Sequence, residues 1–186
     1  RLKVWINDDG LIFMEQNKPS FFDIISNERL VRCFHPLSLD ERFPVRIVST
    51  GLRDIIMPIS APNVLETMVP DFNEISILSK EMKCIGIHCF ALTESDIDNA
   101  STAVCRNFAP LYGINEEAAT GTSNCALACY LHNLGIRPQR YIFEQGHNLS
   151  SVSRIIVELK TDSDILGVRV GGDGIIEGIL DKDIIS

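Results

Sequence analysis

Short apolar stretches follow one another along most of the chain, and some of them, such as residues 45–49, alternate with polar residues as half-buried strands do. Residues 3–6 and 11–16 flank the turn-forming sequence Asn7-Asp8-Asp9-Gly10, and this arrangement predicts a β-hairpin. Further strands are expected at residues 45–49, 52–59, 84–92, 103–109, 141–146, 153–160, 167–171 and 174–180. The chain is therefore expected to consist mainly of strands.

Three segments have helical spacing instead. Residues 20–34 carry apolar side chains at imperfect helical intervals, and a second helix is expected to begin at Pro70-Asp71 and to reach Met82. Residues 123–134 are apolar over most of the helix surface, and such a helix is normally buried. Many strands, few helices and no regular β-α-β alternation favour the α+β class. We expect a curved, mostly antiparallel sheet, or half-barrel, wrapped around the buried helix 123–134.

Length and charge limit the possible partners. The 186 residues fit a single domain, residues 1–186. A net charge of −8 without a cluster of Lys or Arg argues against a nucleic-acid partner. No apolar run approaches the roughly 18 residues of a membrane helix, so no membrane association is expected. The chain begins with Arg1 beside an expected strand, which suggests a removed segment or a fragment of a longer protein.

The cysteines do not form a recognisable metal or redox motif. Six are present, none lies in a Cys-x-x-Cys pair, and most have apolar neighbours. Cys125 and Cys129 lie one turn apart in the expected central helix, where a thiol behaves as a small apolar group that packs in the core. We therefore expect no metal site and a reducing, cytoplasmic setting.

The candidate chemistry lies where a loop of small residues enters the helix 123–134. The first N–H groups of a helix have no partner within the helix, and the helix dipole adds partial positive charge. Gly121 would let a ligand approach the backbone, and the hydroxyls of Thr120, Thr122 and Ser123 lie beside it. This composition suits a carboxylate or a phosphate. The alternative is ordinary N-capping of the helix by Thr or Ser.

Charged residues next to this loop have two interpretations each. Glu116 and Glu117 could supply a general acid or base for a bound ligand, or could form a solvated surface pair. Arg106 could bind a substrate carboxylate through two parallel hydrogen bonds, or could be the partner in a structural ion pair.

The same region resembles a known family signature. Residues 106–114 read R-N-F-A-P-L-Y-G-I and residues 116–122 read E-E-A-A-T-G-T, which resembles the pattern R-x-F-x-P-x-x-G-I-x-E-D-P-A-T-G-S-A of the phenazine-biosynthesis PhzF family. Three other segments resemble family segments in the same order: V-S-T-G-L at 48–52, F-E-Q-G at 143–146 and V-R-V-G-G at 168–172.

The resemblance implies a diaminopimelate epimerase-like fold, in which two similar domains enclose an active site. This chain resembles the C-terminal domain only, and the N-terminal domain would be absent from it. The implied function is that of a cofactor-independent isomerase that shifts a proton on a small carboxylate-bearing metabolite. Glu117 would be catalytic, and substrate-binding residues would be Thr120, Gly121, Thr122, Ser123 and Arg106. The expected partner is the missing N-terminal domain or a second copy in a homodimer.

Three departures from the signature leave a second function open. Glu117 replaces Asp, Ala118 replaces Pro, and Thr122 replaces Ser. The longer Glu117 side chain could displace a proton donor by about 1 Å, a shift that can cost on the order of 100-fold in rate. The alternative function is therefore a small-anion-binding module without catalysis.

Overall fold

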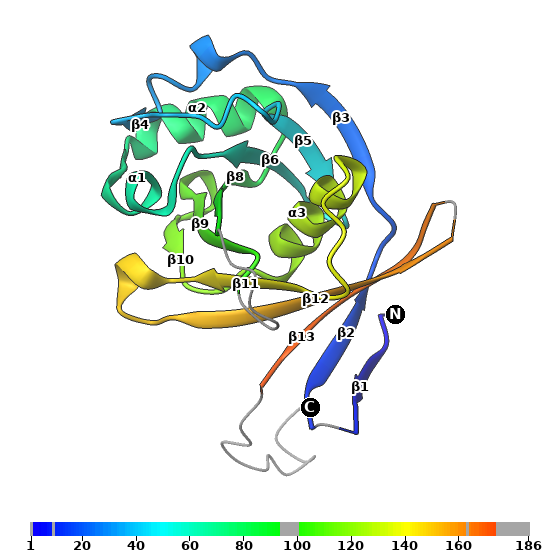
Figure 1. Ribbon diagram of the computed structural model, residues 1–186. Coiled ribbons are helices and arrows are strands. Elements are labelled where there is room, and N and C mark those ends of the chain that lie inside the picture. Colours follow the sequence, from blue (N-terminus) through cyan, green and yellow to red (C-terminus); the bar gives the residue numbers. More distant parts are fainter. Residues whose placement is uncertain (1, 9, 94–100, 163, 174–186) are drawn as a thin grey trace, which may run out of the picture.

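The computed structural model describes residues 2–8, 10–93, 101–162 and 164–173, and one large sheet dominates this part of the chain (Figure 1). Its eleven described strands are β1 (Val4–Ile6), β2 (Ile12–Gln16), β3 (Ser20–Ile24), β5 (Arg46–Ser49), β6 (Arg53–Pro58), β8 (Gly86–Leu92), β9 (Ala103–Ala109), β10 (Ile114–Glu117), β11 (Tyr141–Gln145), β12 (Ser153–Thr161) and β13 (Ile165–Gly172). The spatial order is β1-β2-β13-β12-β11-β9-β8-β6-β5-β3, with β10 beside β9. All neighbours are antiparallel except the pairs β6–β8 and β9–β11.

Helices lie on both faces of this sheet. The α-helices among the described residues are α1 (Pro62–Thr67), α2 (Phe72–Met82) and α3 (Gly121–Asn133). A small second sheet joins β4 (Phe34–His35) to β7 (Val69–Pro70), and short 3-10 turns occur at Asn27–Arg29, Pro110–Tyr112 and His147–Leu149. The strands curve around α3, whereas α1 and α2 cover the outer face of β6, β8 and β9 (Figure 1).

The chain connection between β2 and β3 shows how far the sheet curves. Only residues 17–19 separate these strands, yet seven other strands lie between them in the strand order. Asn17 donates its backbone N–H to the carbonyl of Thr50 at 3.2 Å, which holds the connection against the turn that follows β5. The described strands therefore form the expected curved, mostly antiparallel sheet without closing into a barrel.

The burial of α3 confirms the predicted central helix. Nine consecutive residues, Ser123–Leu131, are buried, so no side of the helix faces solvent over this length. They pack against Val48 and Ile56 from the first half of the chain and against Phe143, Val157 and Val170 from the second half. Cys125 and Cys129 lie in this core, as expected for packing residues.

The expected helix at 20–34 is wrong. This segment forms β3, a 3-10 turn and β4, because Phe21 pairs with Val48 and Ile24 with Arg46 on the neighbouring strand β5. Apolar spacing within a segment contains no information about a partner some 25 residues away, and β propensity depends on such partners. The short helix α1 was not predicted, and the expected strand at 174–180 lies outside the described residues.

The β1–β2 hairpin presents an exposed apolar face. Directly opposed residues of neighbouring strands point to the same side of a sheet. Val4 pairs with Met14, and Met14 pairs with Val170, which packs beside α3. The apolar hairpin face comprises Val4, Ile6, Ile12 and Met14, whose exposed fractions are 62, 68, 39 and 36%. The sheet surface that packs on α3 thus continues beyond the helix as an apolar surface that no described residue covers.

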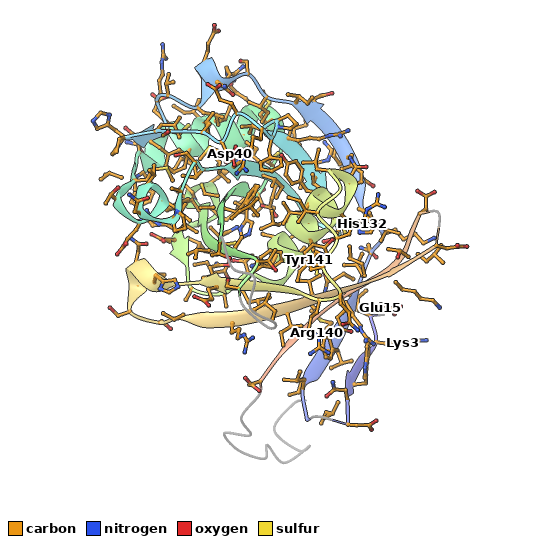
Figure 2. All side chains as sticks on the ribbon, in the orientation of Figure 1. Lys3, Glu15, Asp40, His132, Arg140 and Tyr141 are labelled. Carbon is orange, nitrogen blue, oxygen red and sulfur yellow. The ribbon has the colours of Figure 1, made fainter. Side chains whose placement is uncertain are left out.

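The opposite face of the hairpin is charged and aromatic. The guanidinium of Arg169 lies over the rings of Trp5 and Phe13, and it forms an ion pair with Glu158. Figure 2 shows Glu15 and Arg140 close to this part of the sheet, and both line a groove of about 750 Å³ there. A Cβ at Gly171 would lie 2.6 Å from the ring of Phe13, which explains a glycine at this position of the V-R-V-G-G segment.

Candidate active-site wall

The strand β10 places Glu117 at the start of α3. β10 pairs with β9 through Ile114 opposite Ala109 and Glu117 opposite Asn107, and the helix begins after three intervening residues. Asn124 donates its N–H to the carbonyl of Thr120 at 3.1 Å, which closes the first helical turn. Within the described ranges, no residue accepts a hydrogen bond from the backbone N–H groups of residues 121–123. These donors and the helix dipole favour an anion beside Glu117.

The hydroxyl groups at this helix start have different partners. Thr120 precedes the helix but makes no side-chain capping bond, and its Oγ1 instead donates to Oε2 of Glu117 at 2.8 Å. Ser123 is buried, and its hydroxyl donates to Oδ2 of Asp54 at 2.8 Å. Thr122 Oγ1 lies 3.5 Å from Oε1 of Gln16, a long contact. Of the predicted hydroxyl ligands, Thr122 is therefore the least committed within the protein.

The backbone conformation at position 121 does not require a glycine. Its φ lies outside the left-handed region, and a Cβ there would lie 3.4 Å from Cγ1 of Val170, which is an ordinary packing distance. The added atom would face β13. This geometry does not support the expectation that a glycine is needed for close approach of a ligand, although the N–H of Gly121 remains a candidate donor.

Arg106 lies in a structural ion pair. Its Nε and Nη2 each lie 2.8 Å from a carboxylate oxygen of Glu116, and Nη1 donates to the carbonyls of Leu65 and Met68 at 3.0 and 2.6 Å. The side chain is buried and joins β9, β10 and the end of α1. This geometry supports the ion-pair alternative for Arg106 rather than substrate binding. It also distinguishes the two glutamates, because Glu116 is bound to Arg106 whereas Glu117 lies at the start of the helix.

A buried polar network beneath the helix start was not predicted. Asn107 on β9 donates through Nδ2 to Oγ of Ser123 at 3.2 Å and to Nδ1 of His88 at 3.1 Å. Nε2 of His88 lies 3.3 Å from Oδ1 of Asn124. Because Nδ1 accepts from an amide, Nε2 must carry the proton and donate to Asn124. The network therefore fixes a neutral histidine in one tautomer.

The network continues from α3 to β11. Asn124 donates through Nδ2 to the carbonyl of Thr120 at 3.0 Å and to Oε1 of Gln145 at 2.9 Å. Gln145 donates through Nε2 to the carbonyl of Glu117 at 2.7 Å and to Oγ1 of Thr120 at 3.0 Å. Polar residues inside apolar strand patterns, such as His88 and Asn107, are the sequence signal that could have pointed to this network.

Burial determines the charge states in this network. Desolvation raises the pKa of Asp54 to about 7, the Ser123 hydroxyl partly opposes this effect, and the charge of Glu117 adds to it. Desolvation lowers the pKa of His88 to about 4 although its bond to Asn124 favours protonation. His88 is therefore uncharged at neutral pH.

The two cysteines of the central helix are not activated thiols. Burial raises the pKa of Cys129 to about 12 and that of Cys125 well above its ordinary value, so both thiols stay protonated. No group of three or more His, Cys, Asp and Glu side chains in the described ranges is arranged to hold a metal ion. None of the described helices is long and apolar enough to cross a membrane.

Comparisons with known proteins identify the family of this chain. Residues 6–178 match the family model of phenazine biosynthesis-like proteins, PhzC-PhzF. The chain is 31% identical over 181 residues to an uncharacterized isomerase of Clostridium acetobutylicum, covering 91% of this chain and 59% of the relative. It is 25% identical to the uncharacterized isomerase YddE of Escherichia coli K12, covering 80% of this chain and 51% of the relative. The chain thus spans little more than half the length of these curated relatives.

Solved structures show the same fold. A phenazine biosynthesis protein of the PhzF family from Bacillus anthracis superposes with a TM-score of 0.76 at 25% identity, covering 92% of this chain and 61% of that chain. A hydroxyproline epimerase from Agrobacterium vitis, at 9% identity and a TM-score of 0.54, shares the fold over 95% of this chain and 54% of that chain. The chain belongs to the PhzC-PhzF family of phenazine biosynthesis-like proteins, and its fold is shared with epimerases.

Proposed function

We propose that this chain forms one wall of the active site of a cofactor-independent isomerase that shifts a proton on a small carboxylate-bearing metabolite. The observation that carries the proposal is the position of Glu117 beside the free first turn of α3. The N–H groups of residues 121–123 would bind a carboxylate of the substrate, with Thr122 Oγ1 as a further donor. Names of the relatives as isomerases support the reaction class.

Glu117 would move the proton. Its ionised carboxylate accepts a proton from a substrate carbon, so the C–H bond breaks, an O–H bond forms and the electron pair spreads into the neighbouring conjugated or carbonyl group. The positive end of the helix dipole stabilises this negative charge. Return of the proton to a different carbon, or to the other face of the same carbon, regenerates the carboxylate and completes the isomerisation.

A second wall would complete the site. Transfer of a proton between two positions needs either a mobile carboxylate or a second group on the opposite side of the substrate. The apolar hairpin face begins next to Val170, which packs against the start of α3. We propose that an N-terminal domain, or a second copy of this chain in a homodimer, covers this face and supplies the second group. This chain alone should therefore bind the substrate weakly and turn nothing over.

Exchange of substrate hydrogen with solvent tests this function. A panel of small aliphatic and aromatic carboxylates is incubated in D₂O with the protein in a form that carries both walls. Wild type should incorporate deuterium at carbon, and Glu117→Gln should lower the rate by about 100-fold or more, since the transferring group is lost. Glu15→Gln, an exposed carboxylate on the outer face of β2, is the control and should keep the wild-type rate.

Two results would contradict the isomerase. Full exchange by Glu117→Gln would show that another group moves the proton. Binding of carboxylates without any exchange would identify the alternative, a small-anion-binding module.

A further inference from the structure

The amide of Gln145 is fully used, and its direction is fixed by its neighbours. Gln145 is completely buried at the end of β11. Its Oε1 accepts from Asn124, and its two Nε2 hydrogens go to the carbonyl of Glu117 and to Oγ1 of Thr120. Exchanging the oxygen and nitrogen would set Nε2 against Nδ2 of Asn124 and Oε1 against the Glu117 carbonyl. Only one orientation of the amide satisfies all three contacts.

This orientation determines how Glu117 is held. Because Oγ1 of Thr120 accepts from Gln145, its own hydrogen is directed to Oε2 of Glu117 at 2.8 Å. The amide thus binds Glu117 twice, through its backbone carbonyl and, by way of Thr120, through its carboxylate. Among the described residues nothing bonds to Oε1 of Glu117, so this is the oxygen that can reach a substrate.

The residue after Gln145 also contacts this loop. Gly146 has φ +93°, and a Cβ there would lie 3.0 Å from the carbonyl of Ala118 and 2.2 Å from that of Ser151. Residues 145–146 therefore pack directly against the loop 117–120, Gln145 through hydrogen bonds and Gly146 through close backbone contact. The family signature has Pro where this chain has Ala118, so the loop here depends more on contacts for its conformation.

We propose that Gln145 is a positioning residue for Glu117: it aims the Thr120 hydroxyl at Oε2 and leaves Oε1 to the substrate. This inference rests on the proposed role of Glu117. Asn124, His88 and Asn107 extend the same one-directional chain of donors, so the orientation of Gln145 is itself fixed by the interior of the protein. The Q-G segment, residues 145–146, would then hold the loop of the E-E-A-A-T-G-T motif at residues 116–122. It would not contact the substrate.

The first experiment does not need activity. The chain is labelled with ¹³C at the Glu carboxyl carbon, and Glu117→Gln assigns the Glu117 signal at pH 7. Thr120→Val removes the hydroxyl, and Gln145→Met keeps the side-chain length without hydrogen bonds. Both should move the signal, and the double variant should move it no further than the larger single change, since both act through one contact. Thr120→Ser should restore the wild-type position, and Gln139→Met, at an exposed glutamine, should leave it unchanged.

A structural role alone for Gln145 predicts a different result. In that case Gln145→Met would lower the unfolding temperature and leave the Glu117 signal in place while Thr120→Val still moves it, which would overturn the proposal. If Gln145→Met does not fold, Thr120→Val and Thr120→Ser still test the hydrogen bond that Gln145 is proposed to direct, because an unmoved Glu117 signal in Thr120→Val excludes that bond.

The second experiment separates this inference from the proposed function. In the deuterium-exchange assay, Thr120→Val and Gln145→Met should lower kcat by about 10- to 100-fold with little change in KM, as expected when a group is misplaced by about 1 Å. A loss expressed only in KM would overturn the positioning role. Absence of exchange in wild type would remove the proposed function, whereas the carboxyl signals would still report whether Gln145 holds Glu117.

Discussion

Individual residues at the start of α3 divide into those that face a ligand and those that hold the site. Glu117 and Thr122 are partly exposed, whereas Asp54, Ser123 and Arg106 are buried and bound to other protein groups. Sequence motifs alone put Arg106 and Ser123 among the ligands, because a motif records residue types but not their hydrogen-bond partners. The hydrogen-bond partners seen in the structure therefore support structural roles for Arg106 and Ser123.

Replacement of Asp54 should change how stability depends on pH. The pKa of Asp54 is raised from 3.8 to about 7, so between these values the folded state holds a proton that the unfolded chain releases. Its stabilising effect is therefore complete below about pH 4 and is lost as the pH rises through about 7. Asp54→Asn cannot ionise, so its free energy of unfolding should fall less between pH 5 and pH 8 than that of wild type.

Urea unfolding at both pH values measures this difference. His88, whose pKa is lowered to about 4, has the opposite effect on stability below its ordinary value of 6.5, but it is present in both proteins and cancels in the comparison. The same change of unfolding free energy with pH in Asp54→Asn and wild type would exclude a protonated Asp54.

Elements were predictable where their pattern is local. The helices α2 and α3 and the strands β5, β6, β8, β9, β11 and β12 lie close to the expected ranges. Residues 20–34 were assigned wrongly because β3 exists through its pairing with β5. The polar network was missed for a similar reason, since His88, Asn107, Asn124 and Gln145 come from four separate elements. Long-range partners are the information that spacing within a segment does not contain.

Two glycines with similar φ angles test how closely backbone carbonyls pack on Gly146, the residue that follows β11. Gly146 and Gly135 have φ +93° and +90°, but a Cβ at Gly135 meets nothing within 4 Å. Gly135→Ala should cost about 1–2 kcal/mol of unfolding free energy from backbone strain alone. Gly146→Ala should cost about 3 kcal/mol or more, because its Cβ also strikes two carbonyls. Equal losses in chemical denaturation would show that the carbonyls of Ala118 and Ser151 do not pack closely on Gly146.

At the scale of the whole molecule, the described residues combine a well-covered helix with a sheet surface that none of them covers. α3 is enclosed by strands from both halves of the chain, but the β1–β2 hairpin projects beyond it (Figure 1). This hairpin carries the apolar hairpin face. Contiguous apolar patches on monomers are usually small, and larger ones mark interfaces. The chain also spans only 59% of the relative from Clostridium acetobutylicum. Both observations support the proposal that a second domain or a second copy covers this face.

Charge on the apolar hairpin face should therefore reduce association of the isolated chain. Ile6 is 68% exposed, so Ile6→Asp should leave the unfolding temperature nearly unchanged while lowering the dimer fraction in sedimentation velocity. Ile24 on β3 is 64% exposed but lies at the other end of the sheet order, and Ile24→Asp is the matched control that should associate like wild type. A wild-type chain that stays monomeric at high concentration would count against self-association through this face.

The anion site at the start of α3 is tested most directly by titrating benzoate into the ¹⁵N-labelled chain and following its amide signals. The amides of Gly121, Thr122 and Ser123 should shift together and saturate at millimolar benzoate. Thr122→Asp places a carboxylate in the first helical turn, where it suits the helix dipole and competes for the same N–H groups. This variant should fold as well as wild type and lose the benzoate response. Shifts confined to other parts of the chain, or an unchanged response in Thr122→Asp, would contradict an anion-binding wall beside Glu117.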